Sequence, residues 1–393
     1  MDNSDGKKVV DNSSDKKGYD KSMVEPNNTL GFSLIDQVEP DENNNVFISP
    51  TSALLALFMA YNGAEGETKE EMAEALEVSG ISVEHLNQAS ASLVDKLEKD
   101  SESIQLSIAN SLWINEKFHF KEKYAQDATS FFQAELSEID IKDNASVDKI
   151  NEWVRQSTND KIDEIVKAPL DRNMVALLIN ALYFKGKWKY KFDEANTEEL
   201  PFKAIDSEKN IPFMVLEEEL EYMENDKFQA VKLPYGNGEM SMNIFLPNGD
   251  FNLEYVMNEL TTDNYEAWRT EFIETKGTVK LPKFKIEYET VLNQALKQLG
   301  MELAFDEKEA NFSNMIKEDD PLWIHEVKQK TYIDVNEEGT EAAAVTSIEM
   351  RTESAVIEDT FYMEVNRPFF FTITEEETGV ILFIGIIREP SVS

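Results

Sequence analysis

The sequence of 393 residues contains no cysteine. Disulfide bonds, thiolate catalysis and cysteine-ligated metal sites are therefore excluded. Only three histidines occur, isolated and far apart in the sequence, and we interpret each as a surface or core residue: His85, His119 and His325. The sequence also has no HExxH, P-loop, Gly-x-Ser-x-Gly or dinucleotide fingerprint. We therefore expect neither an enzyme nor a protein with a metal or another cofactor.

Long apolar runs are also missing. No stretch approaches the roughly 20 apolar residues that a membrane helix needs, so we expect no membrane span. Met1 to Asn27 is polar and has no apolar signal core. We predict a flexible polar N-terminal tail over residues 1–27 and a single domain over residues 28–393.

Basic residues are few. The chain has 38 Lys and Arg against 77 Asp and Glu, which gives a formal net charge of −39. Such a surface repels nucleic acid and anionic lipid and favours cationic partners, so we expect no nucleic-acid binding. Hydrophobic residues make up 41% of the chain, which is enough for a large core. The acidity, the missing cysteine and the excess of lysine over arginine favour a prokaryotic source.

Helical signals dominate the first part of the chain, and hairpin signals dominate the end. Ser49 followed by Pro50 is a typical helix start, with serine as the N-cap and proline at the first helical position. The terminal stretch Pro368–Ile387 predicts a hairpin. The pattern indicates an α+β fold without internal repeats. Helices are predicted over Thr29–Val38, Ser52–Tyr61, Thr68–Leu76, Ala145–Thr158 and Thr290–Leu299, and strands over Asn45–Ile48, Ile104–Ile114, Met174–Phe184, Met240–Leu246 and Val279–Ile286.

One segment, Glu338 to Ser354, has an unusual alternation. Even positions from Thr340 to Thr352 are small or uncharged, and every charge after Thr340 falls at an odd position. A period of two is typical of a strand with one buried and one wet face. Its first half is nearly all alanine, which suits a segment that slides between two strands already in place better than a resident strand. An alanine-rich helix or a passive surface loop is the alternative interpretation of the same residues.

Several stretches in the same order resemble the serpin family. Residues 337–346 are similar, almost residue for residue, to the hinge of inhibitory serpins. Residues 45–52, 180–188, 281–284, 366–369 and 383–385 are similar to other family motifs, so the resemblance covers roughly residues 30–390. The hinge residues are Glu337, Glu338, Gly339, Thr340, Glu341, Ala342, Ala343, Ala344, Val345 and Thr346.

The resemblance implies a serpin fold of three β-sheets and about nine helices, with an exposed reactive-centre loop at about residues 337–360. It also implies a function as a serine-type endopeptidase inhibitor that acts as a metastable suicide substrate. A protease cleaves the loop and forms an acyl-enzyme, and the loop then inserts as an extra strand in the large sheet. The alternative within the family is a non-inhibitory carrier, storage or chaperone-like protein. Such relatives typically have bulky or charged residues in the hinge that block insertion, whereas this hinge has Thr340, three alanines and Thr346.

Family spacing places the scissile bond between Glu353 and Ser354. A glutamate before the bond would require a protease with a basic specificity pocket, since a carboxylate needs a cationic partner. The competing bond is Arg351–Thr352, which would suit a trypsin-like protease. The target is therefore expected to be glutamate-specific or trypsin-like.

The resemblance also assigns residues that control the opening of the large sheet. Ser49, Ser52 and Asn180 match the polar shutter, although Ser49 also serves as a helix cap. Gln329 stands where many members have histidine, which puts pH sensitivity at that position in doubt. Trp188 matches the breach, where the loop first enters the sheet, and a core aromatic is the alternative.

Expectations about partners and location complete the prediction. The stretch corresponding to the glycosaminoglycan-binding helix of some relatives carries only two lysines among acidic residues, so no glycosaminoglycan activation is expected. We expect a monomer that acts outside the cell or at its surface.

Overall fold

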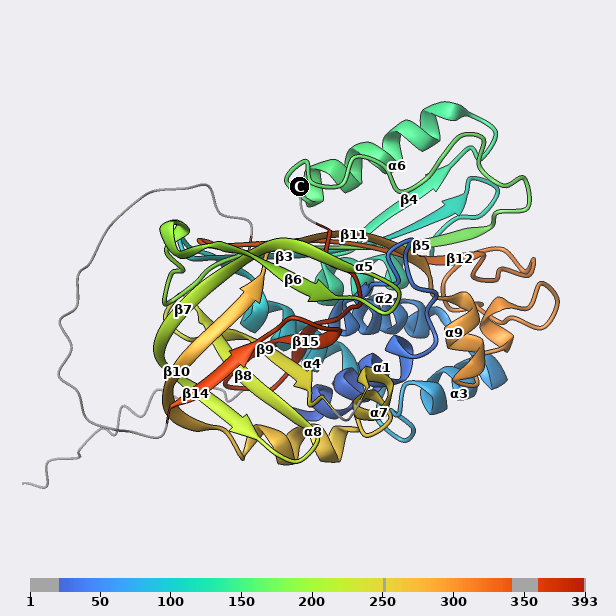
Figure 1. Cartoon of the computed structure of the whole chain (residues 1–393). Coiled ribbons are helices and arrows are strands. Elements are labelled where there is room, and N and C mark those ends of the chain that lie inside the picture. The colour runs from blue at the N-terminus through green and yellow to red at the C-terminus, as the bar shows by residue number, and fades with distance from the viewer. Residues whose placement is uncertain (1–20, 250–251, 341–359, 392–393) are drawn as a thin grey trace, which may run out of the picture.

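The computed structural model describes residues 21–249, 252–340 and 360–391. Helices occupy mainly the first part of the described chain and hairpins the last, which agrees with the predicted α+β order (Figure 1). The described α-helices are α1 (Val24–Ile35), α2 (Pro50–Gly63), α3 (Gly66–Ala75), α4 (Val83–Leu97), α5 (Glu122–Phe132), α6 (Asn144–Ser157), α7 (Leu253–Met257), α8 (Thr262–Arg269) and α9 (Asn293–Gln298). Short 3-10 turns lie at Lys21–Met23, Glu194–Asn196 and Leu303–Phe305.

The large sheet, called sheet I here, has seven described strands in the order β11-β12-β13-β5-β3-β2, with β4 paired to β3. Its two central long strands, β5 and β12, are parallel and pair from Leu177–Glu326 to Leu182–Thr331. We call this paired boundary the seam. The strands are β2 (Lys99–Asp100), β3 (Ile104–Asn115), β4 (Glu135–Ile139), β5 (Ala176–Lys187), β11 (Phe284–Val291), β12 (Glu326–Asn336) and β13 (Gly339–Thr340).

Sheet II has nine described strands in the order β1-β16-β15-β9-β8-β7-β10-β14, with β6 paired to β7. Two of the three expected sheets are continuous here, because the long strand β7 pairs with β10 along most of its length and with β8 at its end. The strands are β1 (Val46–Ile48), β6 (Glu198–Lys203), β7 (Glu208–Glu224), β8 (Phe228–Tyr235), β9 (Met240–Pro247), β10 (Ile273–Pro282), β14 (Phe361–Glu364), β15 (Phe369–Glu375) and β16 (Ile381–Ile387).

Helix α2 lies in the core between the sheets. Its sequence is apolar almost all round, which predicts burial on every side, and every residue except Asn62 is buried. It contacts β5 and β3 of sheet I and β16 of sheet II. A second apolar cluster lies on the opposite face of sheet I, where Ile150 and Val154 of α6 pack on Leu177 and Ile179 of β5. Sheet I is therefore covered on both faces, as Figure 1 shows.

The described domain begins earlier than predicted. Helix α1 starts at Val24 and includes Asn27 and Asn28, which were assigned to the tail and to the domain boundary. Both asparagines are buried because their side-chain amides donate hydrogen bonds to the terminal hairpin, at Ile381 O and Gly379 O, 3.0 Å each. Polar composition alone gave no sign of these distant partners.

The prediction of one strand over Val279–Ile286 was wrong. The chain leaves sheet II after Pro282 and enters sheet I at Phe284. Pro282 has no N–H to donate, and the Lys283 amide instead donates to Pro212 O at 2.9 Å. The following helix also starts later than predicted, at Asn293, because Thr290 still belongs to β11.

Candidate functional site

The seam opens at one end. Beyond Thr331 and Leu182, β12 and β5 are no longer paired with each other, and the two-residue strand β13 lies between them. Gly339 pairs with Asn336 on one side and Lys187 on the other, and Thr340 pairs antiparallel with Val335 and Gly186. Gly339 and Thr340, the third and fourth residues of the predicted hinge, thus already occupy a strand position inside sheet I.

The two residues of β13 fit this position closely. A Cβ on Gly339 would lie 2.0 Å from Gly186 O, and its φ is +148°, a value that L-residues rarely adopt. The side chain of Thr340 is fully buried, and its hydroxyl lies 2.7 Å from the hydroxyl of Tyr235. Burial raises the pKa of Tyr235, so the phenol is neutral and either hydroxyl can donate.

Two carboxylates hold the chain just before β13. Glu337 accepts hydrogen bonds from Lys283 Nζ and Thr197 Oγ1, both at 2.8 Å, although it is almost completely buried. Burial alone would raise the pKa of Glu337, but the hydrogen bonds from Lys283 and Thr197 outweigh it and hold the pKa below its ordinary value. Glu338 lies 3.6 Å from Lys191 Nζ. The hinge is therefore anchored by charge as well as by strand pairing.

Trp188 is a buried aromatic that lies beside the start of the hinge. Its ring is buried and stacks on Tyr235 at 4.4 Å with an interplanar angle of 12°, as expected of a core aromatic. Its indole Nε1 donates to Asn336 O at 2.9 Å, and its backbone amide donates to Glu338 O at 3.0 Å. Trp188 thus contacts the chain on both sides of the point where the hinge enters the sheet.

A buried polar cluster lies under the paired part of the seam. It consists of Ser49, Ser52, Asn110, Asn180 and Gln329, and we call it the polar cluster. Gln329 of β12 donates to Asn180 Oδ1 of β5 at 2.9 Å, so this bond spans the seam. Asn180 Nδ2 donates to Ser52 O at 2.8 Å and to Asn110 Oδ1 at 2.6 Å. The four predicted shutter residues therefore lie together, and Asn110 joins them.

Gln329 and Ser49 form a reciprocal pair. The Ser49 amide donates to Gln329 Oε1 at 2.8 Å, and Gln329 Nε2 donates to Ser49 O at 2.9 Å. The Ser49 side chain accepts from the Ser52 amide at 3.3 Å, so its predicted capping role is confirmed. A primary amide supplies both a donor and an acceptor and does not titrate, so Gln329 links the sheet to α2 in the same way at any physiological pH.

Residues 158–175, which we call the strap, cover the outer face of the seam. Ile162, Ile165 and Val166 of the strap pack in the apolar cluster under α6. Lys330 Nζ donates to Glu164 O at 2.8 Å, and Lys328 Nζ donates to Ile165 O at 3.1 Å. A strand can therefore enter the full length of the seam only if the strap moves.

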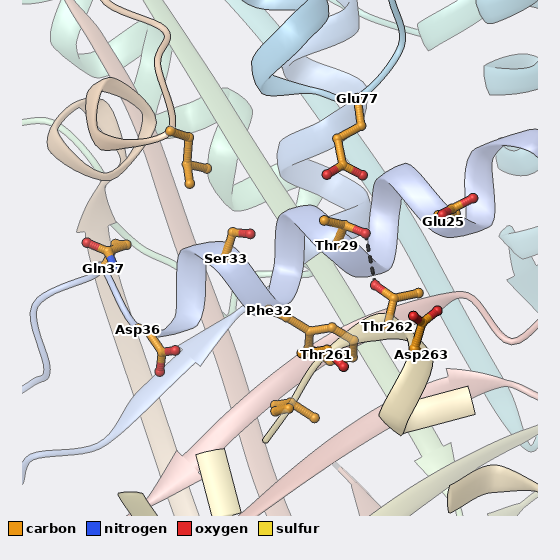
Figure 2. A pocket seen from close by; sticks show the side chains of 12 residues that line it. Glu25, Thr29, Phe32, Ser33, Asp36, Gln37, Glu77, Thr261, Thr262 and Asp263 are labelled. Atoms are coloured by element: carbon orange, nitrogen blue, oxygen red, sulfur yellow. Dashed lines mark hydrogen bonds between the residues drawn. The ribbon is translucent and has the colours of Figure 1, made fainter. Parts of the chain in front are cut away.

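A separate cavity of about 510 Å³ lies between α1 and the start of α8, as Figure 2 shows. Its described lining carries Glu25, Asp36, Glu77 and Asp263, and the apolar Phe32 lies among them. Burial raises the pKa of Asp36, with the Arg388 charge acting in the opposite direction. None of the predicted site residues lines this cavity, so it is distinct from the seam.

The remaining predicted residues lie outside the described chain. These are the hinge positions after Thr340, namely Glu341, Ala342, Ala343, Ala344, Val345 and Thr346, and the candidate bonds Glu353–Ser354 and Arg351–Thr352. Five contributing side chains were not predicted from the sequence: Asn110, Lys191, Thr197, Tyr235 and Lys283. Lys283 stands within a motif shared with serpins, but nothing local in the sequence indicates its pairing with Glu337, more than 50 positions away.

Two kinds of site were sought among the described residues. In that part of the chain, no group of three or more His, Asp or Glu side chains is arranged to hold a metal ion. Among the described helices, none is both long and apolar enough to cross a membrane.

Comparison with known proteins identifies relatives over nearly the whole chain. The family model described as "Serpin (serine protease inhibitor)" matches residues 25–390. An uncharacterised serpin-like protein of Methanosarcina mazei is 32% identical over 96% of this chain and 89% of its own, and human Serpin B8 is 34% identical over 94% and 99%. The native-state crystal structure of Tengpin, a thermophilic serpin, has a TM-score of 0.88 at 32% identity and covers 95% of each chain. Archaeal relatives are consistent with a prokaryotic source.

Proposed function

Because this chain belongs to the serpin family of serine protease inhibitors, we propose that it traps a serine protease by inserting its cleaved reactive-centre loop into sheet I. The protease attacks the loop as a substrate and forms an acyl-enzyme. The loop then enters the seam between β5 and β12 as an added strand. The new strand gains main-chain hydrogen bonds on both sides and buries its even-numbered face, and this release of free energy displaces the bound protease.

The position of β13 is the observation that supports this proposal most. Gly339 and Thr340 already pair antiparallel with both neighbouring strands, so the next residues can follow once the seam opens further and the strap moves. β5 and β12 run parallel to each other, and β13 runs antiparallel to both. A loop that continues β13 into the seam would therefore keep the same antiparallel direction. After Glu341, the small residues Ala342, Ala343 and Ala344 offer little steric resistance.

We propose Glu353–Ser354 as the reactive bond, and Arg351–Thr352 as the second candidate. The first bond would select a glutamate-specific protease, because only a basic pocket compensates for burying a carboxylate. The second would select a trypsin-like protease. Both cuts leave a long segment after Thr340 available for insertion.

A non-inhibitory role is the second candidate function. Thyroxine-binding globulin in complex with thyroxine shares this fold, with a TM-score of 0.83 at 23% identity, so the fold alone does not imply inhibition. The hinge of the present chain favours inhibition, because the position opposite Tyr235 carries the small residue Thr340 and three alanines follow within four positions.

The charges on α4 bear on whether an anionic polysaccharide could bind and activate this protein. Protease nexin-1, a solved structure with 26% identity, was crystallised with heparin. In the present chain, α4 carries Glu84 and Asp95, and its Lys96 pairs with Glu375 and Glu377. We therefore propose that no anionic polysaccharide activates it. We also propose a monomer that acts outside the cell or at its surface.

The first experiment is incubation with a glutamate-specific and a trypsin-like serine protease, followed by denaturing electrophoresis and intact mass measurement. We expect a covalent adduct that resists denaturation and a released peptide that begins at Ser354. A peptide that begins at Thr352 moves the bond to Arg351 and keeps the mechanism. Cleavage without an adduct, and without a gain in thermal stability, supports the non-inhibitory alternative instead.

The variant Thr340→Arg tests insertion directly. An arginine at this position would bury an unpaired charge against Tyr235, at a cost of several kcal/mol. We expect the variant to become a substrate that is cleaved without forming an adduct. The conservative Thr340→Ser is the matched control and should still inhibit, because it keeps the hydroxyl. Retained inhibition by the arginine variant would contradict the insertion mechanism.

A further inference from the structure

The end of the seam opposite β13 is held by two connecting segments. β13 lies beside the end of β5, at Gly186, whereas β3 ends beside the start of β5, at Ala176. Residues 119–121 follow β3 and therefore lie near this opposite end, on the β5 side of the seam. Residues 315–318 precede β12 and belong to the other side. Contacts between these two segments thus join the two sides of sheet I.

Backbone pairing holds the two segments together. Phe120 forms an isolated antiparallel bridge with Ile316, and a backbone hydrogen bond of 2.9 Å lies on each side of it. The segment before β12 is fixed in turn to the helices, because the Asn314 amide donates to Gly63 O at the end of α2, at 3.1 Å. We call this pairing, together with the side-chain contacts of His119 beside it, the clasp.

His119 contacts two carboxylates that come from different elements. Its ring Nδ1 lies 2.8 Å from Glu318 Oε1, and its backbone amide donates to Glu318 Oε2, also at 2.8 Å. Ring Nε2 lies 4.0 Å from Glu138 Oε2 of β4. β4 pairs with β3, so Glu138 belongs to the β5 side of the seam, whereas Glu318 precedes β12. The imidazole therefore lies between carboxylates from the two sides.

Only the protonated ring suits both carboxylates. An ionised carboxylate accepts hydrogen bonds and donates none. The ring nitrogen that contacts Glu318 must therefore carry a proton, and in a neutral ring the lone pair of the other nitrogen faces Glu138. The imidazolium has a proton on each nitrogen and a positive charge, so it attracts both carboxylates. Protonation of His119 thus tightens the clasp.

Glu318 is prepared for this contact. Burial alone would raise the pKa of Glu318, but the hydrogen bonds from the amide and the ring of His119 outweigh it and hold the pKa below its ordinary value. Glu318 is therefore ionised throughout the range in which a histidine changes its charge, about pH 5 to pH 8. Within that range, the proton on the imidazole decides the strength of the contact.

The ammonium groups near His119 are those of Lys117, Lys121 and Lys317. Lys121 Nζ donates to Ser313 O at 2.6 Å, and Lys117 Nζ lies 4.6 Å from the centre of the Phe118 ring. The side chain of Lys317 is exposed. The carboxylates next to the clasp in sequence are those of Glu116, Glu122, Asp319 and Asp320. The titratable groups that contact the ring directly are Glu138 and Glu318, and both favour its protonated form.

We propose that protonation of His119 tightens the clasp and so slows the opening of the seam in acid. The proposal rests on the proposed function, because strand insertion has to separate β5 from β12 by roughly 4.8 Å. β3 and β4 are paired to β5 and to each other and must move with it. This movement draws Glu138 away from Glu318, and the charged imidazole that attracts both opposes it.

Partial exposure limits the size of the effect. The side chains of His119, Glu138 and Glu318 are 53%, 36% and 26% exposed, so solvent screens their attraction. We therefore expect protonation to slow the opening about two- to fivefold. The closed seam binds the proton more tightly than the open seam, so acid favours closure and a rise in pH removes this contribution.

The test measures how fast a peptide with the sequence of residues 340–352, capped at both ends, binds to the intact protein at about pH 5.5 and about pH 8. The peptide contains no histidine. We expect slower binding at the lower pH for the unmodified protein and nearly equal rates for His119→Gln. The chain has two other histidines, so His85→Gln and His325→Gln are the matched controls and should keep the pH dependence. His325 is the stricter control, because its Nε2 lies 3.9 Å from Asp171 of the strap.

A disulfide tests the clasp without a change of pH. The chain has no cysteine, so Phe120→Cys combined with Ile316→Cys allows a single disulfide. Antiparallel partners have Cα atoms about 4.5–5.5 Å apart, within the range that a disulfide accepts. We expect the oxidised variant to bind the peptide more slowly than the reduced variant at both pH values. The two forms share the same substitutions, so the loss of the original side chains cancels in this comparison.

Three results would overturn the proposal. They are equal binding rates of the unmodified protein at the two pH values, loss of the pH dependence in His325→Gln instead of His119→Gln, and equal rates for the oxidised and reduced disulfide variant. Failure of the proposed function looks different. If the protein binds no peptide at either pH and forms no adduct with the glutamate-specific or the trypsin-like protease, insertion itself fails and the role of the clasp fails with it.

Discussion

At the scale of single residues, Glu337 shows how a buried charge can hold the start of a short strand in place. The carboxylate is nearly inaccessible and yet ionised, because Lys283 and Thr197 both donate to it. Lys283 lies between β10 and β11, where the chain passes from sheet II to sheet I. The pair therefore connects the start of the hinge to the junction between the two sheets. Removing one partner of such a pair leaves the other buried and uncompensated.

We predict that Glu337→Gln destabilises the intact protein by about 1–3 kcal/mol at neutral pH. The pKa of Glu337 is held below its ordinary value of 4.5, so its ionised form contributes stability above that pH and loses it as the pH falls through the lower folded value. The difference in unfolding free energy between the wild type and Glu337→Gln should thus shrink in acid. Urea titrations at a series of pH values measure it, and a pH-independent difference would refute the assignment. Glu338→Gln is the control, since its contact with Lys191 is longer at 3.6 Å.

Part of the candidate site could be predicted from the sequence. The rest could not, because its contacts join residues that are far apart in the chain. The Ser49 cap could be predicted because its partner, Ser52, is three residues away. Asn180 and Gln329 were assigned through resemblance, and the structure adds that they bond directly across the seam. Tyr235 could not be predicted as the partner of Thr340, because their contact depends on where two sheets meet, 105 positions apart in sequence.

At the scale of elements, the strap and α6 cover the face of the seam that the proposed insertion must open. Asn151 of α6 is buried, and its side chain makes three hydrogen bonds to the strap. Its Nδ2 donates to Val166 O at 2.9 Å, and its Oδ1 accepts from the backbone amides of Ile165 and Val166. One side chain therefore satisfies three backbone groups of an irregular segment. The stability of this contact sets how easily the outer face of the seam is uncovered.

We predict that Asn151→Ala makes the seam easier to open. Losing three hydrogen bonds and leaving backbone groups unsatisfied should destabilise the intact protein by about 2–3 kcal/mol. A synthetic peptide with the sequence of residues 340–352 should also bind faster, because the strap moves aside more readily. Binding is followed by native electrophoresis or intrinsic fluorescence. Gln156→Ala on the same helix is the control, since its amide donates to the exposed Glu152 alone among the described contacts. Equal binding rates for the two variants would contradict the barrier role.

Element prediction succeeded where the pattern was local and failed at junctions. Helix α2 and strand β5 follow from continuous apolar runs. The change of sheet at Lys283 has no periodic signal, because the residues on both sides keep a strand-like alternation and only the hydrogen-bond partner differs. The start of α1 could not be predicted for a similar reason. Asn27 and Asn28 are polar, and they are buried because their side chains donate to backbone carbonyl groups far away in the sequence.

At the scale of the molecule, the net charge of −39 determines how partners approach. Glutamates gather on the strands next to the end of the reactive loop, which re-enters the described chain just before β14. Glu217 and Glu219 of β7 and Glu274 of β10 are exposed there, and β10 pairs with β14. Charges of one sign on a surface accelerate association with oppositely charged partners by about 10- to 1,000-fold at low salt. The proposed insertion would take place inside the protein, where salt has little influence.

We therefore predict that salt changes the rate of inhibition and leaves its efficiency unchanged. For a cationic target protease, the second-order rate constant should fall at least about tenfold between about 0.02 and 0.5 M salt, because the Debye length shrinks from roughly 20 Å to about 4 Å. The number of inhibitor molecules consumed per protease should stay constant.

Neutralising the three glutamates near β14 should slow association more than neutralising three exposed glutamates of α3, which lies across the molecule from β7 (Figure 1). A salt-independent rate with a cationic protease, or equal effects of the two triple variants, would show that surface charge does not guide the encounter. The two triple variants are Glu217→Gln, Glu219→Gln, Glu274→Gln and the control Glu67→Gln, Glu70→Gln, Glu74→Gln.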